Sequence, residues 1–589
     1  MKRNTYQFLI PEKKVKNSNT TYDIYPTHSI SDGEIETGYQ SLANRLVSER
    51  ILILDGYIGV DWAEVISVLS PLIKNNGKTL RVTDINSCLK PEKDICKMVE
   101  PFLGGEDPIF GFRANIELKD YFDPNKIEDI TPDENVDIQI IFGTGASQCG
   151  IEGFLVYFDL PKNELQYRMK AGAIKNLGLS AAKDANQMYK HFYFVDWVVL
   201  NNEKRSLLSK ISIIVDQQRP GHPTWMDGKI LRNALTKMSK SYFRVRPWFQ
   251  PGVWGGQWMK NRFDGLNKKQ DNYAWSFEMI VPENGLLFES DGRLLEVSFD
   301  MLMYQNKENV LGKAAKRFGN EFPIRFNFLD TFDGDNLSVQ CHPSPEYIKK
   351  EFGENFTQDE TYYMLDSCED AEVYLGFQKG IDPDEFQRAL EHSFETKETL
   401  DVERYVQKFK SKKHDLFLIP HGTVHCSGIN NMVLEISATT YLFTFKMYDW
   451  QRMDLDGKPR PINIDHAFKN LNFDRQGLDV AETLISHPVV ESAGEGWKKV
   501  HLPTHADHFY DIYRYEFEGE IEIETLDQCH LLMLVEGESI ELNVNGNIPH
   551  TFHYAETFAV PAAAGMYQLK NKGDTTAKVI VSFVKDEAC

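Results

Sequence analysis

The chain has 589 residues, of which 42% are hydrophobic and 26% are charged. This length is too great for a single hydrophobic core, so we expect two to four domains of ordinary globular composition. The formal net charge of −22 argues against nonspecific binding to nucleic acid, which depends on an excess of lysine and arginine. An anionic substrate would therefore need a local group of cations.

Two further features concern the compartment. No segment reaches the roughly 18 consecutive apolar residues of a membrane span, and the basic N-terminal segment lacks the apolar stretch of a signal peptide. The eight cysteines form no CxxC pair, which is typical of reduced thiols in an intracellular protein. We therefore predict a cytoplasmic protein with no membrane partner.

Residues 1–240 are predicted to form an α/β domain. An apolar strand at 51–54 is followed by a helix over 61–73, whose apolar residues recur at helical spacing and whose N-cap is Asp61. Strands that alternate with helices in this way indicate a parallel, doubly wound sheet. Further buried strands are expected at 138–141 and 153–160.

The segment 51–73 weakly resembles the phosphate-loop unit of nucleoside and uridine kinase-like proteins. A working loop reads GxxxxGK[ST], and its backbone amides and lysine hold phosphates. If Gly56 is the first glycine, Asp61, Trp62 and Ala63 stand where Gly, Lys and Ser/Thr belong. The resemblance therefore implies a degenerate nucleoside-kinase-like domain, and we expect no kinase activity from it.

The second half of the chain is predicted to be mainly β-structure. A polar, Pro-containing connection at 216–225 and a helix-like stretch at 229–242 precede it. Short strands then dominate residues 241–485, as in a cupin barrel of the jelly-roll type. Runs of β-type residues over 486–589 suit a second, smaller cupin-like β-barrel.

One helical insertion is expected within this β region. Asp382 followed by Pro383 is an N-cap and first-turn signal, and it predicts a helical insertion near 382–410.

Four polar residues in the β region suggest a metal site. Gln340 and His342 are two residues apart in a strand-like run that Pro343 ends, so both side chains point to one face. Glu360 begins a second strand-like run, and His425 follows a glycine-containing turn. Together these residues form an N₂O₂ set with room for water, which suits zinc or another borderline divalent ion.

At these motifs the sequence resembles a type I phosphomannose isomerase. The segments FNFLD, LSVQCHP, DETYYMLD, VYLGF, IPHGTVH, VLEIS and YDWQRMDLDGKPRP occur in the order of that family, from near Trp254 to the C-terminus. The family is a zinc-dependent cupin that interconverts mannose 6-phosphate and fructose 6-phosphate. The resemblance thus implies one zinc ion per chain, held by Gln340, His342, Glu360 and His425, and a hexose phosphate substrate.

The same resemblance places Ser338, Glu435 and Lys446 near the substrate, with Glu435 and Lys446 as candidate catalytic residues. The chain departs from the family at two of its positions. Gln358 stands where the family has a pocket lysine, and Lys446 stands where it has an arginine. Lysine keeps the charge but lacks the bidentate fork that suits a phosphate.

Three residues have both a functional and a structural interpretation. His421 is a candidate catalytic base, and the alternative is a surface or supporting histidine. Lys458 and Arg460 would add positive charge near a phosphate, and the alternative is an exposed, solvated loop.

Three functions are compatible with these residues. The leading hypothesis is a metal-dependent isomerase acting on mannose 6-phosphate or a close hexose phosphate. A non-catalytic, metal-containing sugar-phosphate-binding cupin is the alternative, because Gln358 removes a cation. An iron-dependent cupin oxygenase is disfavoured, because Gln340 would take a coordination position that oxygenases leave vacant.

Overall fold

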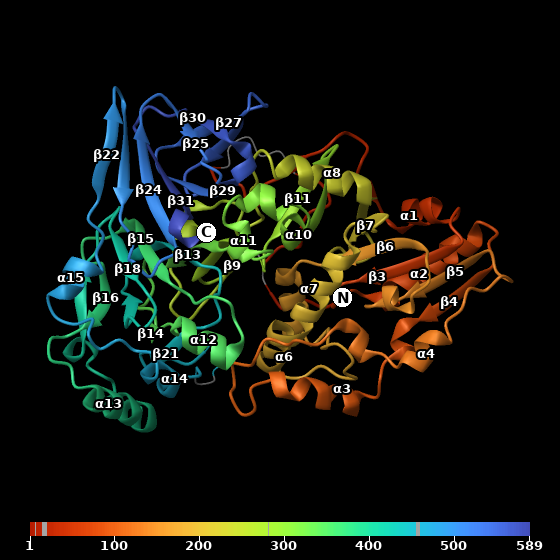
Figure 1. Cartoon of the computed structure of the whole chain (residues 1–589), viewed down its shortest axis with the longest axis horizontal. Helices are drawn as coiled ribbons and strands as arrows, with labels where there is room; N and C mark the ends of the chain where they lie inside the picture. Colours follow the sequence, from red (N-terminus) through yellow and green to blue (C-terminus); the bar gives the residue numbers. More distant parts are fainter. Residues whose placement is uncertain (6, 15–20, 281, 455–456, 458–459) are drawn as a thin grey trace. The chain divides into compact units, whose positions relative to one another are not determined.

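The computed structural model describes residues 1–5, 7–14, 21–280, 282–454, 457 and 460–589 (Figure 1). The chain divides into two compact units, here called unit 1 and unit 2. Unit 1 consists of Met1–Asn17, Tyr25–Lys237 and Pro282–Gln305, and unit 2 consists of Ser18–Ile24, Met238–Val281 and Asn306–Cys589. The three-domain division stays a prediction, but its boundary near 240 does not separate the units, because residues 282–305 belong to unit 1.

Unit 1 is built on a seven-stranded mixed sheet of order β2-β8-β7-β6-β3-β5-β4. The predicted α/β fold is confirmed, and the strands β3 to β7 pair with one another in parallel. β8 and β2 add antiparallel pairs at one edge, which the sequence did not indicate. The strands are β2 Glu36–Thr37, β3 Ile51–Gly56, β4 Leu80–Asp84, β5 Ile138–Phe142, β6 Phe154–Asp159, β7 Ile213–Asp216 and β8 Thr224–Asp227.

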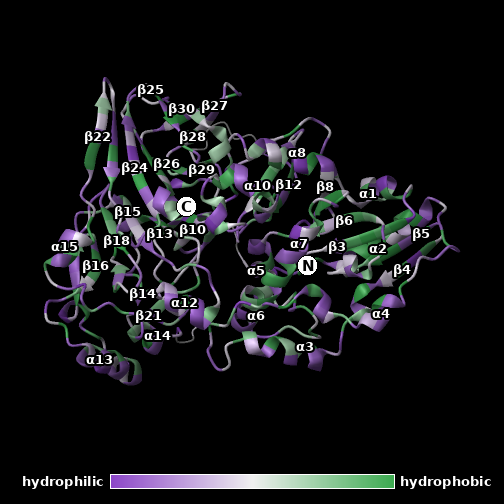
Figure 2. Cartoon of the chain, viewed as in Figure 1, coloured by the Kyte–Doolittle hydropathy of each residue, from purple (hydrophilic) through white to green (hydrophobic). Residues whose placement is uncertain are grey.

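The central strands of this sheet are hydrophobic along their length, as Figure 2 shows for β3 and β6. Parallel strands covered on both faces are expected to have this composition. Their side chains form a core with α1 (Tyr39–Leu46) and α2 (Trp62–Asn75). α2 begins where predicted, because the Asp61 carboxylate accepts a hydrogen bond from the Glu64 amide.

Residues 282–305 complete unit 1 at the carboxyl ends of its parallel strands. β11 (Gly285–Ser290) and β12 (Arg293–Ser298) form a three-stranded sheet with β1 (His28–Ser29). At the end of β12 the Ser298 amide donates to the Asp159 carboxylate at the end of β6, at 2.7 Å. The remaining helices are α3 Glu92–Val99, α4 Pro124–Glu128, α5 Lys162–Lys170, α6 Ala185–His191, α7 Trp197–Leu207 and α8 Gly228–Met238. The helix α10 (Asp300–Leu311) is kinked at Asn306, and its residues from Asn306 onward belong to unit 2.

Unit 2 contains four antiparallel sheets, which confirms the predicted β-structure. Two of them carry the candidate site. The first has the order β18-β15-β20-β13-β10-β9 and the second has the order β17-β16-β19-β14-β21. Their strands are β9 Trp248–Gln250, β10 Trp275–Met279, β13 Ile324–Asp330, β14 Val339–Cys341, β15 Glu360–Ser367, β16 Glu372–Phe377, β17 Val406–Lys410, β18 Leu416–Ile419, β19 His425–Ser427, β20 Asn431–Ala438 and β21 Phe445–Tyr448.

The other two sheets form a separate sandwich at the C-terminal end of the chain, here called the C-terminal sandwich (residues 489–589). Their orders are β22-β23-β24-β31-β26-β29 and β25-β30-β27-β28, and inward-facing apolar residues of both sheets share one core. The strands are β22 Val489–Gly494, β23 Trp497–Leu502, β24 Tyr510–Phe517, β25 Glu520–Glu524, β26 His530–Glu536, β27 Ser539–Val544, β28 His550–His553, β29 Thr557–Val560, β30 Met566–Asn571 and β31 Ala577–Val584.

The predicted helical insertion is present but shorter than expected. α13 spans Pro383–Thr396, and the Asp382 side chain caps it by accepting from the amides of Asp384 and Glu385. Lys397 adopts a left-handed conformation and ends the helix, so the strand β17 occupies part of the range that was predicted as insertion. The other helices of unit 2 are α9 Trp258–Arg262, α11 Ala315–Phe318, α12 Pro345–Phe352, α14 Ile464–Phe468 and α15 Asp479–Thr483. Among the described residues, no helix combines the length and hydrophobicity needed to cross a membrane.

Candidate metal site

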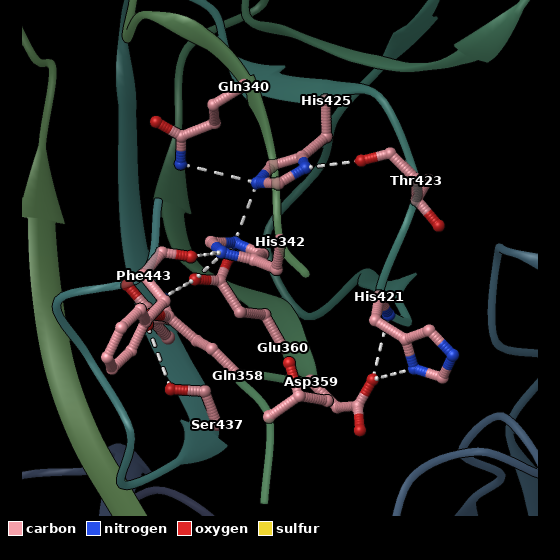
Figure 3. Close-up of polar contacts among 12 residues, drawn as sticks. Gln340, His342, Gln358, Asp359, Glu360, His421, Thr423, His425, Ser437 and Phe443 are labelled. Atoms are coloured by element: carbon pink, nitrogen blue, oxygen red, sulfur yellow. Dashed lines mark hydrogen bonds and ion pairs between the residues drawn. The ribbon is translucent and has the colours of Figure 1, made fainter. Parts of the chain in front are cut away.

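Three of the four predicted metal ligands meet in the interior of unit 2. The Nε2 atom of His342 lies 2.9 Å from Glu360 Oε1, and the Nε2 atom of His425 lies 3.4 Å from Glu360 Oε2. One potential ligand atom from each residue lies within 4.8 Å of those of the other two. All three side chains are buried, and Figure 3 shows both imidazoles directed at the carboxylate.

Backbone carbonyls fix the orientation of both imidazoles. His342 donates from Nδ1 to the Phe443 carbonyl at 3.0 Å, and His425 donates from Nδ1 to the Thr423 carbonyl at 2.9 Å. A carbonyl can only accept, so each Nδ1 carries a proton and each Nε2 is available as a ligand. This arrangement is usual for metal-bound histidine, whose second nitrogen is held by an outer hydrogen bond.

Unsatisfied atoms in this group test whether a divalent ion fits. His342 Nε2 and Glu360 Oε2 are buried and have no hydrogen-bond partner within the described part of the chain. Leaving such atoms without a partner is costly, and a bound cation would satisfy both. Two imidazole nitrogens and a carboxylate form a donor set that suits zinc and similar ions. The residues therefore fit a divalent metal site.

The Glu360 carboxylate is strongly influenced by its neighbours. Burial opposes its ionisation, but the adjacent His342 and His425 hold the pKa of Glu360 well below its ordinary value. This effect requires the positive charge of protonated imidazoles. A divalent cation bound to the two Nε2 atoms in place of their protons would favour the ionised carboxylate in the same way.

Strand pairing explains why these side chains converge. Gln340 on β14 is directly opposite His425 on β19 and opposite Lys446 on β21. Directly paired residues point to the same face of a sheet, so these three form one row. In the other sheet, Glu360 is opposite Ser437 on β20, and Ser437 is opposite Arg325 on β13. The contacts of His342 and His425 with Glu360 join the two rows.

Gln340, the fourth predicted ligand, lies at the edge of this group. Its amide nitrogen is 3.3 Å from His425 Nε2, and its side chain is 8% exposed. The structure thus brings all four predicted ligands together. The role of Gln340 as a ligand stays a prediction.

Glu435 lies beside the trio in a second buried charged group. Arg325 forms an ion pair with Glu435 Oε1, and its guanidinium is 3.7 Å from Glu360 Oε1. Ser437 and Asn327 also donate to the Glu435 carboxylate, at 2.9 and 3.3 Å. Burial raises the pKa of Glu435, and Arg325 works against that shift.

The predicted substrate residues Ser338, Arg460 and Lys446 are arranged around Asp449. Ser338 donates to Asp449 Oδ1 at 2.7 Å, and Arg460 donates to Asp449 Oδ2 at 2.7 Å. Burial lowers the pKa of Lys446 to about 8, and the positive charge of Arg460 adds to this shift. Lys458 lies outside the described residues. The result is a cationic region next to the row that contains Gln340 and His425.

His421 and Gln358, two of the predicted site residues, make contacts that the sequence did not predict. The His421 ring donates from Nδ1 to Asp359 at 2.9 Å and is turned away from the metal residues (Figure 3). The reason is alternation along β15, because Asp359 precedes Glu360 and points to the opposite face. Gln358 is buried and donates through its amide to Glu360 Oε1, so it contacts a predicted metal ligand.

The segment that resembles a phosphate loop is filled by side chains of unit 1. Trp62 donates from its indole nitrogen to Thr144 Oγ1 at 3.3 Å. The Arg168 guanidinium donates to the carbonyls of Gly59 and Gln217, at 2.9 and 3.0 Å. One carbonyl of the loop, that of Gly59, is thus bound by a cation of the protein itself.

Sequence reasoning missed Arg325, Asn327, Tyr362 and Asp449. The first two alternate in an otherwise apolar strand, IRFNFLD, and an arginine in a buried strand is a signal of an internal ion pair. Tyr362 is opposite Glu435 in the sheet, and its hydroxyl has no hydrogen-bond partner among the described residues. Only strand pairing identifies it as part of the site.

Comparisons with known proteins divide the chain in two. Residues 38–240 match a domain of unknown function (DUF8485). This match covers most of unit 1 and leaves its kinase-like nature as a prediction.

Over about half of its length the chain is distantly homologous to type I mannose-6-phosphate isomerases. Mannose-6-phosphate isomerase ManA of Bacillus subtilis is 22% identical over 338 residues, which are 55% of this chain and 94% of that protein. A mannose-6-phosphate isomerase of Streptococcus mutans is 23% identical over 304 residues, which are 49% of this chain and 82% of that protein. The crystal structure of the mannose 6-phosphate isomerase from Bacillus subtilis matches with a TM-score of 0.49 at 21% identity, covering 58% of this chain and 99% of that one.

Proposed function

We propose that unit 2 is a metal-dependent aldose–ketose isomerase that interconverts mannose 6-phosphate and fructose 6-phosphate, or a close hexose phosphate. The observation that carries the proposal is the buried trio of His342, Glu360 and His425, within a region distantly homologous to enzymes of that name. Homology alone would leave open whether the site is intact. The two oriented imidazoles and the buried carboxylate beside them support an intact metal site.

His342, Glu360 and His425 would hold the ion, with Gln340 as a further oxygen ligand next to His425. When bound, a divalent cation such as zinc supplies Lewis-acid polarisation of the sugar oxygens. The protein itself contributes the fixed Nε2 positions and a buried environment, in which electrostatic interactions are stronger than in water.

Lys446 is the proposed anchor for the phosphate. It lies in the same row as Gln340 and His425, and Arg460 stands beside it on the carboxylate of Asp449. A net charge of −22 makes such a local cation necessary for binding an anionic sugar. Binding the phosphate at Lys446 would orient the sugar relative to the metal residues, and such orientation makes a large contribution to catalysis.

Glu435 is the proposed group for proton transfer between C1 and C2. Burial raises the pKa of Glu435 above its ordinary value, and proton transfer in catalysis needs a positioned group of suitable pKa. Arg325, which contacts both Glu435 and Glu360, would hold the carboxyl in place during this transfer. His421 has no part in this scheme, because its ring contacts Asp359 instead.

One observation favours a second candidate, a non-catalytic sugar-phosphate-binding protein. Gln358 occupies the place of a cation in the family and is committed to a hydrogen bond with Glu360. The pocket therefore has one cation fewer than its relatives are expected to have.

A turnover assay separates the two candidates. The full chain, loaded with zinc, is given mannose 6-phosphate, other hexose 6-phosphates and unphosphorylated mannose, and ketose formation is followed. An isomerase converts a phosphorylated sugar and spares free mannose. Tight binding of the phosphorylated sugars without ketose formation would favour the non-catalytic protein.

For unit 1 we propose a structural role without phosphoryl transfer. Trp62 is hydrogen-bonded to Thr144 and Arg168 to the Gly59 carbonyl of the loop, and neither a lysine nor a magnesium-holding hydroxyl stands at the required positions. Incubation of the full chain with ATP and magnesium tests this. ADP formation above background that disappears on changing Asp61 to Ala would contradict the proposal.

A further inference from the structure

The turn that precedes His425 is attached to the C-terminal sandwich through two charged residues. Arg475 lies between that turn and the sandwich, and Asp507 belongs to the segment just before β24. Neither residue belongs to the metal site described above. The contacts nevertheless lead from Asp507 to His425 without interruption.

The first contact in this series fixes His425. Its Nδ1 atom donates to the carbonyl of Thr423 at 2.9 Å, so the position of Thr423 sets the direction of the imidazole. The Thr423 hydroxyl in turn donates to the Pro420 carbonyl at 2.6 Å, which closes the turn on itself.

Arg475 holds this turn from outside. Its Nη1 atom donates to Thr423 Oγ1 at 2.6 Å and to the Pro420 carbonyl at 3.1 Å, and it also contacts the His421 carbonyl. One planar guanidinium group thus binds several acceptors of a single turn. Its rigid fork makes it better suited to this task than a lysine.

Asp507 completes the attachment. The Arg475 Nη2 atom is 3.2 Å from Asp507 Oδ2, and the side chains of Arg475 and Asp507 are 13% and 37% exposed. A second contact comes from Tyr510, whose hydroxyl donates to the Ile436 carbonyl at 2.8 Å. The C-terminal sandwich therefore contacts both the turn that precedes His425 and the strand that carries Glu435.

We propose that Arg475 and Asp507 are positioning residues for the metal ligand His425, and that the C-terminal sandwich thereby supports the metal site. This inference rests on the proposed function. Outer partners of metal-bound histidines typically change metal affinity by about 10- to 100-fold when they are removed. A sandwich that was merely appended to the chain would not affect the metal.

The chain offers a matched control. Glu536 on β26 also belongs to the C-terminal sandwich, and it contacts His414 Nε2 at 2.7 Å and Lys413 at 2.9 Å. His414 and Lys413 precede β18, and the hydrogen bonds and ion pairs of the described residues connect neither of them to a ligand of the proposed metal. Glu536→Gln therefore removes a comparable contact to the sandwich without affecting the turn before His425.

The experiment measures zinc affinity by chelator competition for the full chain and for Arg475→Met, Arg475→Lys, Asp507→Asn and Glu536→Gln. We expect Arg475→Met to weaken zinc binding about 10- to 100-fold, Asp507→Asn to weaken it less, and Arg475→Lys to lie between the wild type and Arg475→Met. Glu536→Gln should bind zinc like the wild type. The visible spectrum of the cobalt-loaded Arg475→Met protein should also differ from that of the wild type, because the geometry around the ion changes.

Asp507→Asn keeps the test decisive if Arg475→Met fails to fold, because it changes a partly exposed side chain. Equal zinc affinity and equal cobalt spectra for Asp507→Asn, Glu536→Gln and the wild type would overturn the inference. A wild-type chain that binds zinc but isomerises no hexose phosphate would overturn the proposed function instead, while the affinities would still report on Arg475.

Discussion

Both units bury carboxylates, but they satisfy them in different ways. In unit 1, Asp55 accepts hydrogen bonds from the amides of Gly56, Gly145 and Ser147 at 2.7 to 2.8 Å. In unit 2, Glu360 contacts two histidines, and one of its oxygens lacks a hydrogen-bond partner in the part of the chain that the structure describes. Burial of an acid is therefore no sign of a site by itself. The informative feature is a buried acid whose neighbours are other potential metal ligands.

The two units also differ in how a lysine is paired with carboxylates. Lys204 in unit 1 lies 3.4 Å from Asp159 and 3.2 Å from Asp300, so two carboxylates surround it. Lys446 in unit 2 is partly exposed and contacts no carboxylate within salt-bridge distance in the described part of the chain. Desolvation and the positive charge of Arg460 lower its pKa to about 8. Lys204 is thus neutralised within the fold, whereas Lys446 remains available for an anion.

The largest effect is expected from removing the metal ligands. His342→Ala and His425→Ala should each lose the metal and reduce turnover about 1,000-fold or more, since several kcal/mol of charge stabilisation are lost. Metal analysis of the purified variants and the turnover assay measure this. Full metal occupancy in both variants would show that the ion binds elsewhere.

Removal of the metal should lower the stability of unit 2 and leave that of unit 1 unchanged. With zinc in 100- to 1,000-fold excess over its dissociation constant, unit 2 should gain about 3–4 kcal/mol of stability. Hydrogen exchange with and without a chelator measures this separately for each unit. Equal changes in β3 of unit 1 and β20 of unit 2 would remove the distinction between the units.

Lys446→Met tests the available cation. We expect KM to rise and kcat/KM to fall. The fall should correspond to a loss of about 2–4 kcal/mol in transition-state stabilisation, which is typical of leaving a buried charge without its partner. Lys446→Arg is the matched control and should retain most of the activity, because it keeps the charge. Kinetics unchanged by Lys446→Met would place the phosphate elsewhere, for example near Arg460.

Asp55→Asn tests the structural acid of unit 1. Replacing one acceptor by an amide group should lower the free energy of unfolding by about 1–3 kcal/mol, because a backbone amide loses its partner. Denaturant unfolding measures this loss, and kcat/KM of the folded variant should remain that of the wild type. A selective loss of kcat/KM would instead give unit 1 a part in the reaction.

The smallest effect is expected from Gln358→Lys. The new cation should raise kcat/KM for hexose phosphates about two- to fivefold, the equivalent of one partly screened ion pair of up to about 1 kcal/mol. Gln358→Met serves as the neutral control. A loss of activity in Gln358→Lys that is larger than in Gln358→Met would show that the amide contact with Glu360 is required.

Local patterns in the sequence were sufficient to select four residues that meet in the interior of unit 2 and to predict several elements, while the role of those residues as metal ligands stays a prediction. Alternation in LSVQCHP correctly predicted that Gln340 and His342 share a face, and the Asp61 and Asp382 caps mark the starts of α2 and α13. The part that could not be predicted depends on long-range pairing. Arg325 reaches Glu435 only because β13 and β20 are neighbours.

Contacts between residues that are distant in the sequence also explain two other differences between the predictions and the structure. The segment Pro282–Gln305 joins unit 1 through contacts such as that of Ser298 with Asp159, which are separated by 139 positions in the chain. His421 is two residues from Thr423 in the predicted motif, yet its ring is hydrogen-bonded to Asp359. Asp359 points to the face opposite that of its neighbour Glu360, so the His421 ring is directed away from the metal residues.

The most direct test of the account is the metal dependence of turnover by the full chain. The protein is stripped with a chelator, reloaded with one equivalent of zinc, and given mannose 6-phosphate, with His342→Ala treated in parallel. We predict that the stripped protein is inactive, that one zinc ion per chain restores fructose 6-phosphate formation, and that His342→Ala stays inactive. Full turnover by the stripped protein, or equal turnover by His342→Ala, would contradict the proposed metal site.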